Sequence, residues 1–311
     1  MISCTEFIPS YSELFSYIEE NHGREDVDRF WRYLFAPDGK GIPLINYVEK
    51  QGIRGCFEYW KGTLNEEAAD FTMYLNEKAG WFTYVMHRCP SKGRLLELEK
   101  TIGIKPYHDY CLHCDNYRLA CEKAGLRYIY NFMGIENAAC SAFIYDPARF
   151  DGRMIINEQT EIMDRKAAQN EYFHRDFHSS LNMGIDYLAK TYGVHELHAY
   201  LRQYTGNVYR KQIESIKKSG LPELMNLISN TYHAEHAEDA VAFEHEPDRL
   251  TVNISYCPGV KHLRQTGRTV SEWYIDTTRI VMSVIAEETG YSFCMENYNK
   301  ETGAARYSFF K

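Results

Sequence analysis

The run Trp81-Phe82-Thr83-Tyr84-Val85-Met86-His87-Arg88-Cys89-Pro90 decides how the rest of the chain is interpreted. Its aromatic and β-branched residues predict a strand, and the proline predicts where that strand ends. Tyr107 to Asp115, rich in Cys and His, follows it, and a helical segment ends near Gly125. Two short apolar runs, 126–133 and 140–145, complete the stretch. No other part of the sequence concentrates so many residues that can carry chemistry.

A weaker copy of this run occurs downstream. Thr251-Val252-Asn253-Ile254-Ser255-Tyr256-Cys257-Pro258 matches residues 83–90 at a separation of 257 − 89 = 168 residues. Lys50-Gln51-Gly52-Ile53 matches Lys218-Ser219-Gly220-Leu221 at the same separation. Self-similarity at so long a period favours two repeated domains over a solenoid. We expect a first repeat, a linker and a second repeat with the bounds 1–147, 148–168 and 169–311.

Each repeat is predicted to contain several helices, a strand, a further helix and a pair of strands. This order is typical of α+β proteins with an antiparallel sheet. The patterns predict helices at 44–50 and 65–76, a loop at 38–43, and strands that include 81–88 and 250–256. We therefore expect two duplicated α+β domains that superpose and pack as a pseudo-dimer.

Composition excludes several classes of partner. The chain has 311 residues, 44% of them hydrophobic, and a formal net charge of −8 without a basic stripe, which disfavours nucleic acid and acidic membranes. No apolar run approaches the ~20 residues of a membrane-spanning helix. The N-terminus lacks a signal-peptide pattern, so we expect a cytoplasmic protein. The nine cysteines are then free thiols, metal ligands or catalytic groups rather than disulfides.

The cysteines and histidines of the first repeat suggest a metal site. His87 and Cys89 are two apart on a predicted strand, so their side chains share a face. Cys111 and Cys114 lie one helical turn apart. These four residues match the ligands that Zn²⁺ prefers, with Fe as the other candidate. Alternatively, Cys89 is only a packed residue at the end of the strand. Further candidate ligands are His108 and Cys140.

The same residues suit nucleophilic catalysis. The dipole of a helix N-terminus stabilises the thiolate of a cysteine such as Cys111 or Cys114. His108 or His113 is then the candidate base, as a Cys–His pair requires, and Asp115 is the candidate orienting group. The sequence leaves open whether a thiolate or a metal-bound water attacks the substrate.

A second set of candidates opens the second repeat. His174 and His178 are spaced i, i+4 around Asp176, which predicts either an acid–base pair on one helix face or a helix N-cap. If one composite pocket forms, we expect the helix near His178 to lie against the first repeat, and His178→Ala to change stability by no more than ~1 kcal/mol. The His-rich segment 233–239 is interpreted as a solvated acidic face.

This pattern resembles the L-2-amino-thiazoline-4-carboxylic acid hydrolase family and, more distantly, vinyl-reductase-type small-molecule-binding domains. The resemblance covers most of each repeat. It rests on the following features: Cys89-Pro90 and Cys257-Pro258 at strand ends, Cys111 or Cys114 with Asp115 at a helix start, and a turn at 136–139 before Cys140. The second repeat departs from it, with Asp276, Arg279 and Ala304 or Ala305 in place of Cys111, Cys114 and Cys140.

The resemblance implies a hydrolase that acts on a heterocyclic or amide-like C–N bond of a small molecule, with its site in the first repeat. The alternative is a non-enzymatic small-molecule or metal-binding protein of the sensor type. A third hypothesis is a redox protein in which the C-x-x-C motif is the whole site. We expect a small-molecule partner, and either a monomeric pseudo-dimer or a homodimer.

Overall fold

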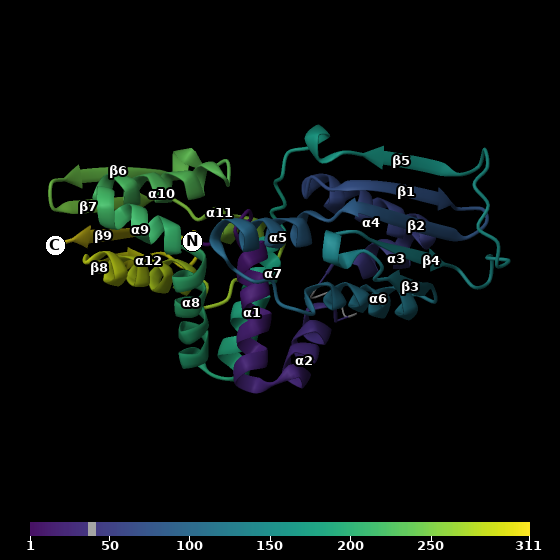
Figure 1. Cartoon of the computed structure of the whole chain (residues 1–311), viewed down its shortest axis with the longest axis horizontal. Helices are drawn as coiled ribbons and strands as arrows, with labels where there is room; N and C mark the ends of the chain where they lie inside the picture. The colour runs from purple at the N-terminus through teal and green to yellow at the C-terminus, as the bar shows by residue number, and fades with distance from the viewer. Residues whose placement is uncertain (37–41) are drawn as a thin grey trace. The chain divides into compact units, whose positions relative to one another are not determined.

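The computed structural model describes residues 1–36 and 42–311, which form two compact units. Unit 1 comprises residues 1–17, 100–104 and 175–311, and unit 2 comprises residues 18–99 and 105–174. Unit 2 thus holds most of the expected first repeat and unit 1 most of the second (Figure 1). The loop expected at 38–43 lies largely outside the described residues.

Unit 2 is built on a five-stranded antiparallel sheet with the strand order β3-β4-β2-β1-β5. Its strands are β1 (Asp70–Asn76), β2 (Trp81–Arg88), β3 (Arg127–Asn131), β4 (Cys140–Tyr145) and β5 (Glu161–Arg165). Its helices are α2 (Arg24–Leu34), α3 (Leu44–Gln51), α4 (Ile53–Glu66), α5 (Pro90–Ile102) and α6 (Tyr117–Lys123), with a 3₁₀ helix at Tyr110–Asn116. Both α5 and the first helix of the chain, α1 (Phe7–His22), contribute residues to both units.

The core of unit 2 lies between one face of this sheet and helices α3, α4 and α6. Alternate residues of the two central strands, such as Met73 in β1 and Phe82 in β2, are fully buried there. Trp60 of α4 stacks on Phe82 with ring centroids 5.8 Å apart. Period-two burial of this kind is what an amphipathic strand requires.

Unit 1 carries a four-stranded antiparallel sheet with the order β6-β7-β9-β8. Its strands are β6 (Val241–Glu246), β7 (Arg249–Ile254), β8 (Ser292–Tyr298) and β9 (Ala305–Phe310). Its helices are α7 (Phe177–Thr191), α8 (Val194–Val208), α9 (Arg210–Ser219), α10 (Leu221–His233), α11 (Pro258–Gln265) and α12 (Asp276–Thr289). Every helix within the described residues is too short or too polar to cross a membrane.

The α+β prediction with antiparallel sheets is confirmed. The elements from α2 to β4 in unit 2 follow the same order as those from α8 to β9 in unit 1. The strands also neighbour one another in the same order, β1-β2-β4-β3 and β6-β7-β9-β8, and only β5 lacks a counterpart. Cys89 and Cys257 occupy the same place in this order. Each follows a central strand, and its carbonyl accepts the first hydrogen bond of the next helix.

Two predicted elements differ from the structure. The helix predicted at 65–76 is strand β1 in its second half, because Phe71, Met73 and Leu75 alternate with the period of a strand rather than a helix. Residues 161–165, predicted as linker, form β5, which pairs with β1. This edge strand is short and carries charged residues, so its sequence lacks the alternation of apolar and polar residues that predicts a strand.

The glycines that precede α4 and α10 are a shared feature that can be tested. Gly52 has φ 57° and ψ −132°, and Gly220 has φ 73° and ψ −151°. L-residues avoid this conformation, so we expect Gly220→Ala to lower the free energy of unfolding of unit 1 by at least about 1 kcal/mol, measured by urea denaturation. Gly206→Ala in α8, which meets no atom within 4 Å, should instead be stabilising. Equal effects of the two substitutions would contradict the assignment.

Candidate functional site

Four cysteines of unit 2 gather around the end of β2, and we use the name thiol recess for this group of residues. Cys89 follows β2, Cys140 begins β4, and Cys111 and Cys114 lie on the 3₁₀ helix. Side chains at i and i+3 of a 3₁₀ helix lie on one face, which brings the last two together. All four thiols are half-buried, and each is close enough to at least one of the others to raise its pKa.

Desolvation controls the protonation of the recess. It raises the pKa of Cys89 and of Cys111 to about 12 and that of Cys140 to about 11. Burial also raises the pKa of Cys114 well above its ordinary value. Backbone amides of Ser91 and Lys92, at the start of α5, lower the pKa of Cys89 but do not offset its burial. At neutral pH the recess therefore presents neutral thiols.

Cys114 and His113 form a thiol–imidazole pair, with 3.5 Å between Cys114 Sγ and His113 Nε2. Burial lowers the pKa of His113 to about 4, so the ring is neutral at physiological pH. Its Nδ1 faces the carbonyl oxygen of Tyr110, which can only accept, so Nδ1 carries the proton. Nε2 is then the acceptor for the Cys114 thiol. This is the arrangement of a nucleophile and its base, with the base oriented by a third group.

One carboxyl group, that of Glu67, adjoins the recess. Burial raises its pKa, and the nearby His174 and the hydroxyl of Ser91 only partly offset that rise. Ser91 Oγ donates to Glu67 Oε2 at 3.3 Å. The charge of Glu67 in turn raises the pKa of Cys89 and Cys114. Glu67 therefore holds its proton to a higher pH than an ordinary glutamate.

Three further residues of unit 2 that were predicted for the site contact groups other than the four thiols. His87 is exposed, and its Nε2 lies 2.8 Å from Thr72 Oγ1. His108 is 64% exposed, with Glu19 and Asp109 as its acidic neighbours. Asp115 pairs with Arg118 at 3.4 Å rather than with a histidine.

The expected shared face of His87 and Cys89 is absent because β2 ends at Arg88, so the strand alternation does not extend to Cys89. The pairing of β1 with β2 is also irregular there, between Asp70 and Phe71. Across residues 1–36 and 42–311, no group of three or more His, Cys, Asp or Glu side chains is arranged to hold a metal ion.

Unit 1 contains a buried hydrogen-bonded chain centred on His178. The side chains of His178 and Glu235 are each 1% exposed, and His178 Nε2 lies 3.1 Å from both carboxylate oxygens. Tyr274 Oη lies 3.0 Å from His178 Nδ1. Burial opposes ionisation of Glu235, but His178 and the amide of Cys4 outweigh it and hold the pKa of Glu235 below its ordinary value.

The other residues predicted around His178 have separate roles. Helix α7 begins at Phe177, so His174 precedes it and does not share a helix face with His178. His174 belongs to unit 2, where its Nδ1 lies 2.6 Å from Glu66 Oε2. Asp176 is the residue before α7, and its carboxylate accepts from Ser179 Oγ at 2.7 Å. All partners described above for His178 are residues of unit 1.

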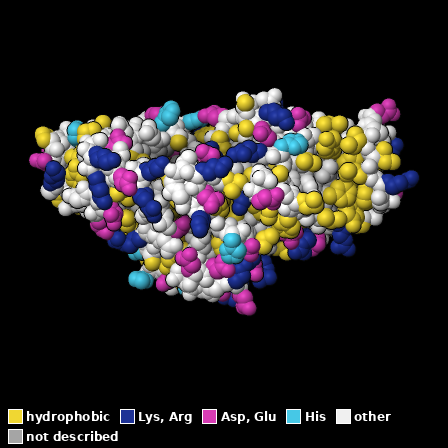
Figure 2. Space-filling view, viewed as in Figure 1, with side chains coloured by type: hydrophobic (Ala, Val, Ile, Leu, Met, Phe, Trp, Pro, Cys, Tyr) yellow, Lys and Arg dark blue, Asp and Glu magenta, His cyan; other side chains and the backbone are white. Residues whose placement is uncertain are grey.

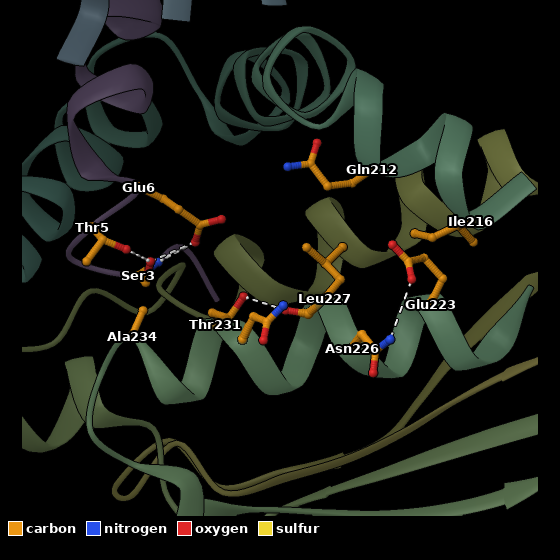
Figure 3. Close-up of a pocket in the computed structure, with 11 residues that line it drawn as sticks. Ser3, Thr5, Glu6, Gln212, Ile216, Glu223, Asn226, Leu227, Thr231 and Ala234 are labelled. Atoms are coloured by element: carbon orange, nitrogen blue, oxygen red, sulfur yellow. Dashed lines mark hydrogen bonds between the residues drawn. The ribbon is translucent and has the colours of Figure 1, made fainter. Parts of the chain in front are cut away.

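A polar cleft of about 260 Å³ also lies in unit 1 (Figure 3). Glu6 lines it near the N-terminus, Gln212 from α9, and Glu223 and Asn226 from α10. Glu223 accepts from Ser215 Oγ at 2.9 Å. Neither Lys nor Arg is among the described residues that line the cleft. It can therefore receive a ligand that offers several N–H or O–H donors.

Sequence reasoning missed Glu67 and Glu235. The two are separated by 235 − 67 = 168 residues, the separation of the Cys-Pro motifs, and each lies just after a helix. Each is followed by a residue with left-handed backbone, Ala68 and His236, both with φ 51°. The repeat separation was the signal that could have found them. Segment 233–239 was interpreted as a solvated face, which is wrong for Glu235.

Comparison of the chain with protein-family models, curated proteins and solved structures gave no match.

The lowered pKa of His113 makes a prediction about pH and stability. The unfolded chain binds a proton at an ordinary pKa near 6.5, whereas the folded chain does so only near pH 4. As the pH falls from about 6.5 to about 4, the free energy of unfolding should therefore decrease by up to about 3 kcal/mol because of this residue. His113→Gln should flatten that part of the profile in urea denaturation at successive pH values. His108→Gln, at an exposed site, is the control, and an unchanged profile in His113→Gln would refute the assignment.

The burial of His178 changes what is expected of its substitution. His178→Ala leaves the Glu235 carboxylate buried without its main partner, so the loss should be about 3–5 kcal/mol rather than the ~1 kcal/mol of a lost cap. Thermal and urea unfolding of the variant would measure it. His195→Ala, where the side chain is 94% exposed, should change stability little. A loss of ~1 kcal/mol in His178→Ala would mean that the buried pair contributes no more than a cap.

Proposed function

We propose that unit 2 is a thiol-dependent hydrolase of small, planar amidine-like or amide-like molecules, which cleaves a C–N bond. The contact between Cys114 Sγ and His113 Nε2, within the thiol recess, carries this proposal. Cys114 is the nucleophile, His113 is the base, and Glu67 is the group that binds and protonates substrate nitrogen.

The reaction proceeds in two balanced steps. The sulfur of Cys114 attacks the planar carbon while its proton passes to His113 Nε2, and the electrons of the C=N or C=O bond move to the heteroatom. The electron pair on the heteroatom then re-forms the double bond, the C–N bond breaks, and the protonated imidazole gives its proton to the departing nitrogen. Water adds to the carbon of the thioester or thioimidate and releases the thiol. Glu67 can donate a hydrogen bond to the substrate or, ionised, hold a cationic amidinium.

The protonated state of the free recess fits substrate-assisted activation. A thiolate formed alone among desolvated groups is costly, as the raised thiol pKa values indicate. A bound amidinium brings positive charge beside Cys114 and Glu67, which lowers the pKa of both groups. Proton transfer from thiol to imidazole then becomes favourable only when substrate is present, which protects the thiol otherwise. The mechanism requires reduced cysteines, and we place the protein in the reducing cytoplasm.

The resemblance to the amino-thiazoline carboxylate hydrolases supports the same class of reaction, since their substrate is a cyclic amidine. We infer further that the two units arose by internal duplication, on the basis of their matching strand orders and the 168-residue separation. Asp276 and Arg279 then stand where unit 2 has Cys111 and Cys114. Arg279 lies 2.5 Å from Asp276, an ion pair that replaces the thiol chemistry.

A second candidate function is ligand binding without turnover. The polar cleft of unit 1 favours it, because its carboxylate and amide side chains suit a small donor-rich ligand and none of the described lining residues is a Cys, His or Lys. In that case the thiols of unit 2 would be packing residues. The two functions differ in what they require of Cys114.

The decisive experiment combines turnover with covalent trapping. Purified protein is incubated with 2-amino-2-thiazoline-4-carboxylate and related cyclic amidines, and ring opening is followed by ¹H NMR. We expect Cys114→Ser to abolish turnover and His113→Gln to reduce kcat/KM by about 10²–10⁴-fold, the usual contribution of a general base. Cys294→Ser, at an exposed thiol of unit 1, should retain full activity.

Trapping tests the site without requiring the right substrate. Chloroacetamidine is a cation and chloroacetamide a neutral analogue of nearly the same size. We expect the cation to alkylate Cys114 faster, because its charge activates the thiol beside Glu67, and Glu67→Gln should remove the difference. Mass spectrometry of peptides identifies the modified cysteine. Equal rates for the two reagents, or alkylation at Cys294 alone, would exclude the proposed site.

A further inference from the structure

The face of the unit 2 sheet opposite its core carries a row of side chains that crosses all five strands and is aromatic or aliphatic except at the buried Thr83, whose hydroxyl donates to the carbonyl of Ala142; we call it the apolar row. Cross-strand pairing places Ile129 opposite Phe143, Phe143 opposite Thr83, Thr83 opposite Tyr74, and Tyr74 opposite Ile162. Directly paired residues point to the same face of a sheet. The row therefore lies on one face, and its ends are well exposed, 55% for Ile129 and 53% for Ile162.

The row is part of a larger apolar surface, which we call the outer face. Tyr145, two residues from Phe143, lies on the same side of β4. Phe150 packs on both, with ring centroids 5.2 Å from Phe143 and 5.0 Å from Tyr145. The segment after Phe150 exposes three more apolar residues, Met154, Ile155 and Ile156, at 52%, 52% and 53%. Figure 2 shows hydrophobic side chains gathered over the strands of unit 2.

The same fold does not require an apolar outer face, as unit 1 demonstrates. Its corresponding row runs Cys294, Ser308, Thr251 and Glu244. There Arg306 binds Glu244 at 3.1 Å and Glu296 at 2.8 Å, so that face is covered by ion pairs. Polar residues thus suffice on the outer face of such a sheet. Folding of unit 2 therefore does not by itself require the apolar row.

We propose that the outer face of unit 2 binds the same face of a second copy of this chain, as a two-fold symmetric sheet-on-sheet interface. The row itself contains no charged residue, and Asp164, two residues from Ile162 on the same face, accepts from Thr72 Oγ1 within the unit. A partner with a charged recognition surface would therefore leave its charges unpaired on the row. An identical row meets this face without such a penalty. The net charge of −8 disfavours an anionic membrane as the occupant.

The size of the outer face fits a dimer. Five strands about 4.8 Å apart, rising about 3.4 Å per residue over five residues, give a face of roughly 400 Å² in projection. Side-chain relief and the adjoining segment with Met154 bring the accessible area towards the roughly 800 Å² per partner of a standard interface. Two sheets packed in this way lie about 10 Å apart, with their apolar rows interdigitated.

The oligomeric state of the full chain tests the proposal. Sedimentation equilibrium should give a dimer for the wild-type protein at concentrations of about 10 µM, whereas Ile129→Glu combined with Ile162→Glu should raise the Kd at least ~100-fold. Cys294→Glu, at the position of unit 1 that corresponds to Ile129, is the matched control and should leave the dimer unchanged. Circular dichroism and thermal unfolding check that each variant is folded.

Several outcomes would overturn the inference. A wild-type monomer at about 100 µM would exclude a dimer of useful affinity. A dimer that persists in the double variant would place the interface elsewhere. A wild-type monomer that binds neutral phosphatidylcholine vesicles through Ile129 and Ile162 would assign the outer face to a lipid surface instead. Each result is independent of whether the thiol recess is catalytic.

Discussion

Each unit buries a carboxyl group just after the helix that precedes its sheet, Glu67 after α4 and Glu235 after α10. The chemistry of both units depends on this constraint. An unpaired carboxylate is costly to remove from water, so each unit must either pair it or keep its proton. Unit 1 pairs Glu235 with His178, and the pKa of Glu235 stays below its ordinary value. Unit 2 gives Glu67 weaker compensation, and its pKa is raised. Positions that follow corresponding helices thus hold a paired carboxylate in unit 1 and a carboxyl group of raised pKa in unit 2.

The two solutions follow from what surrounds each carboxyl group. Gly259 lies in α11 close to His178, and an added Cβ there would lie 2.2 Å from Tyr274 Oη and 2.8 Å from His178 Nδ1. The absence of a side chain makes room for the buried histidine. Ser91 follows Cys89-Pro90 as Gly259 follows Cys257-Pro258, and its hydroxyl donates to Glu67. The residue after the Cys-Pro motif thus leaves room for a buried histidine in unit 1 and supplies a hydrogen bond to the carboxyl group in unit 2.

The sequence predicted those parts of the structure that depend on local pattern. Strand β2 and strand β4 have the predicted bounds because their apolar residues alternate between turns. Strand β1 was predicted as part of a helix because Asn65 belongs to the end of α4. Only the few residues around Ala69 separate the helical pattern of α4 from the alternating pattern of β1. The spacing of Cys111 and Cys114 predicted that they lie one helical turn apart, and both lie on the 3₁₀ helix. The sequence left His108 and His113 as candidate bases, and only the fold distinguishes the half-buried His113 from the exposed His108.

Residues whose role depends on burial were not predictable in the same way. Glu235 lies in an acidic segment that looks solvated, and its 1% exposure arises from packing of distant residues such as His178. The protonation state of the four thiols was also not predictable, because no local sequence pattern shows how far burial will raise the pKa of a cysteine. Desolvation makes Cys114 and Cys111 poor nucleophiles in the free protein, and it also makes any cation that enters the recess a strong influence on them. Under the proposed function, such a site selects its ligand by charge, because a cationic ligand lowers the thiol pKa values that burial has raised.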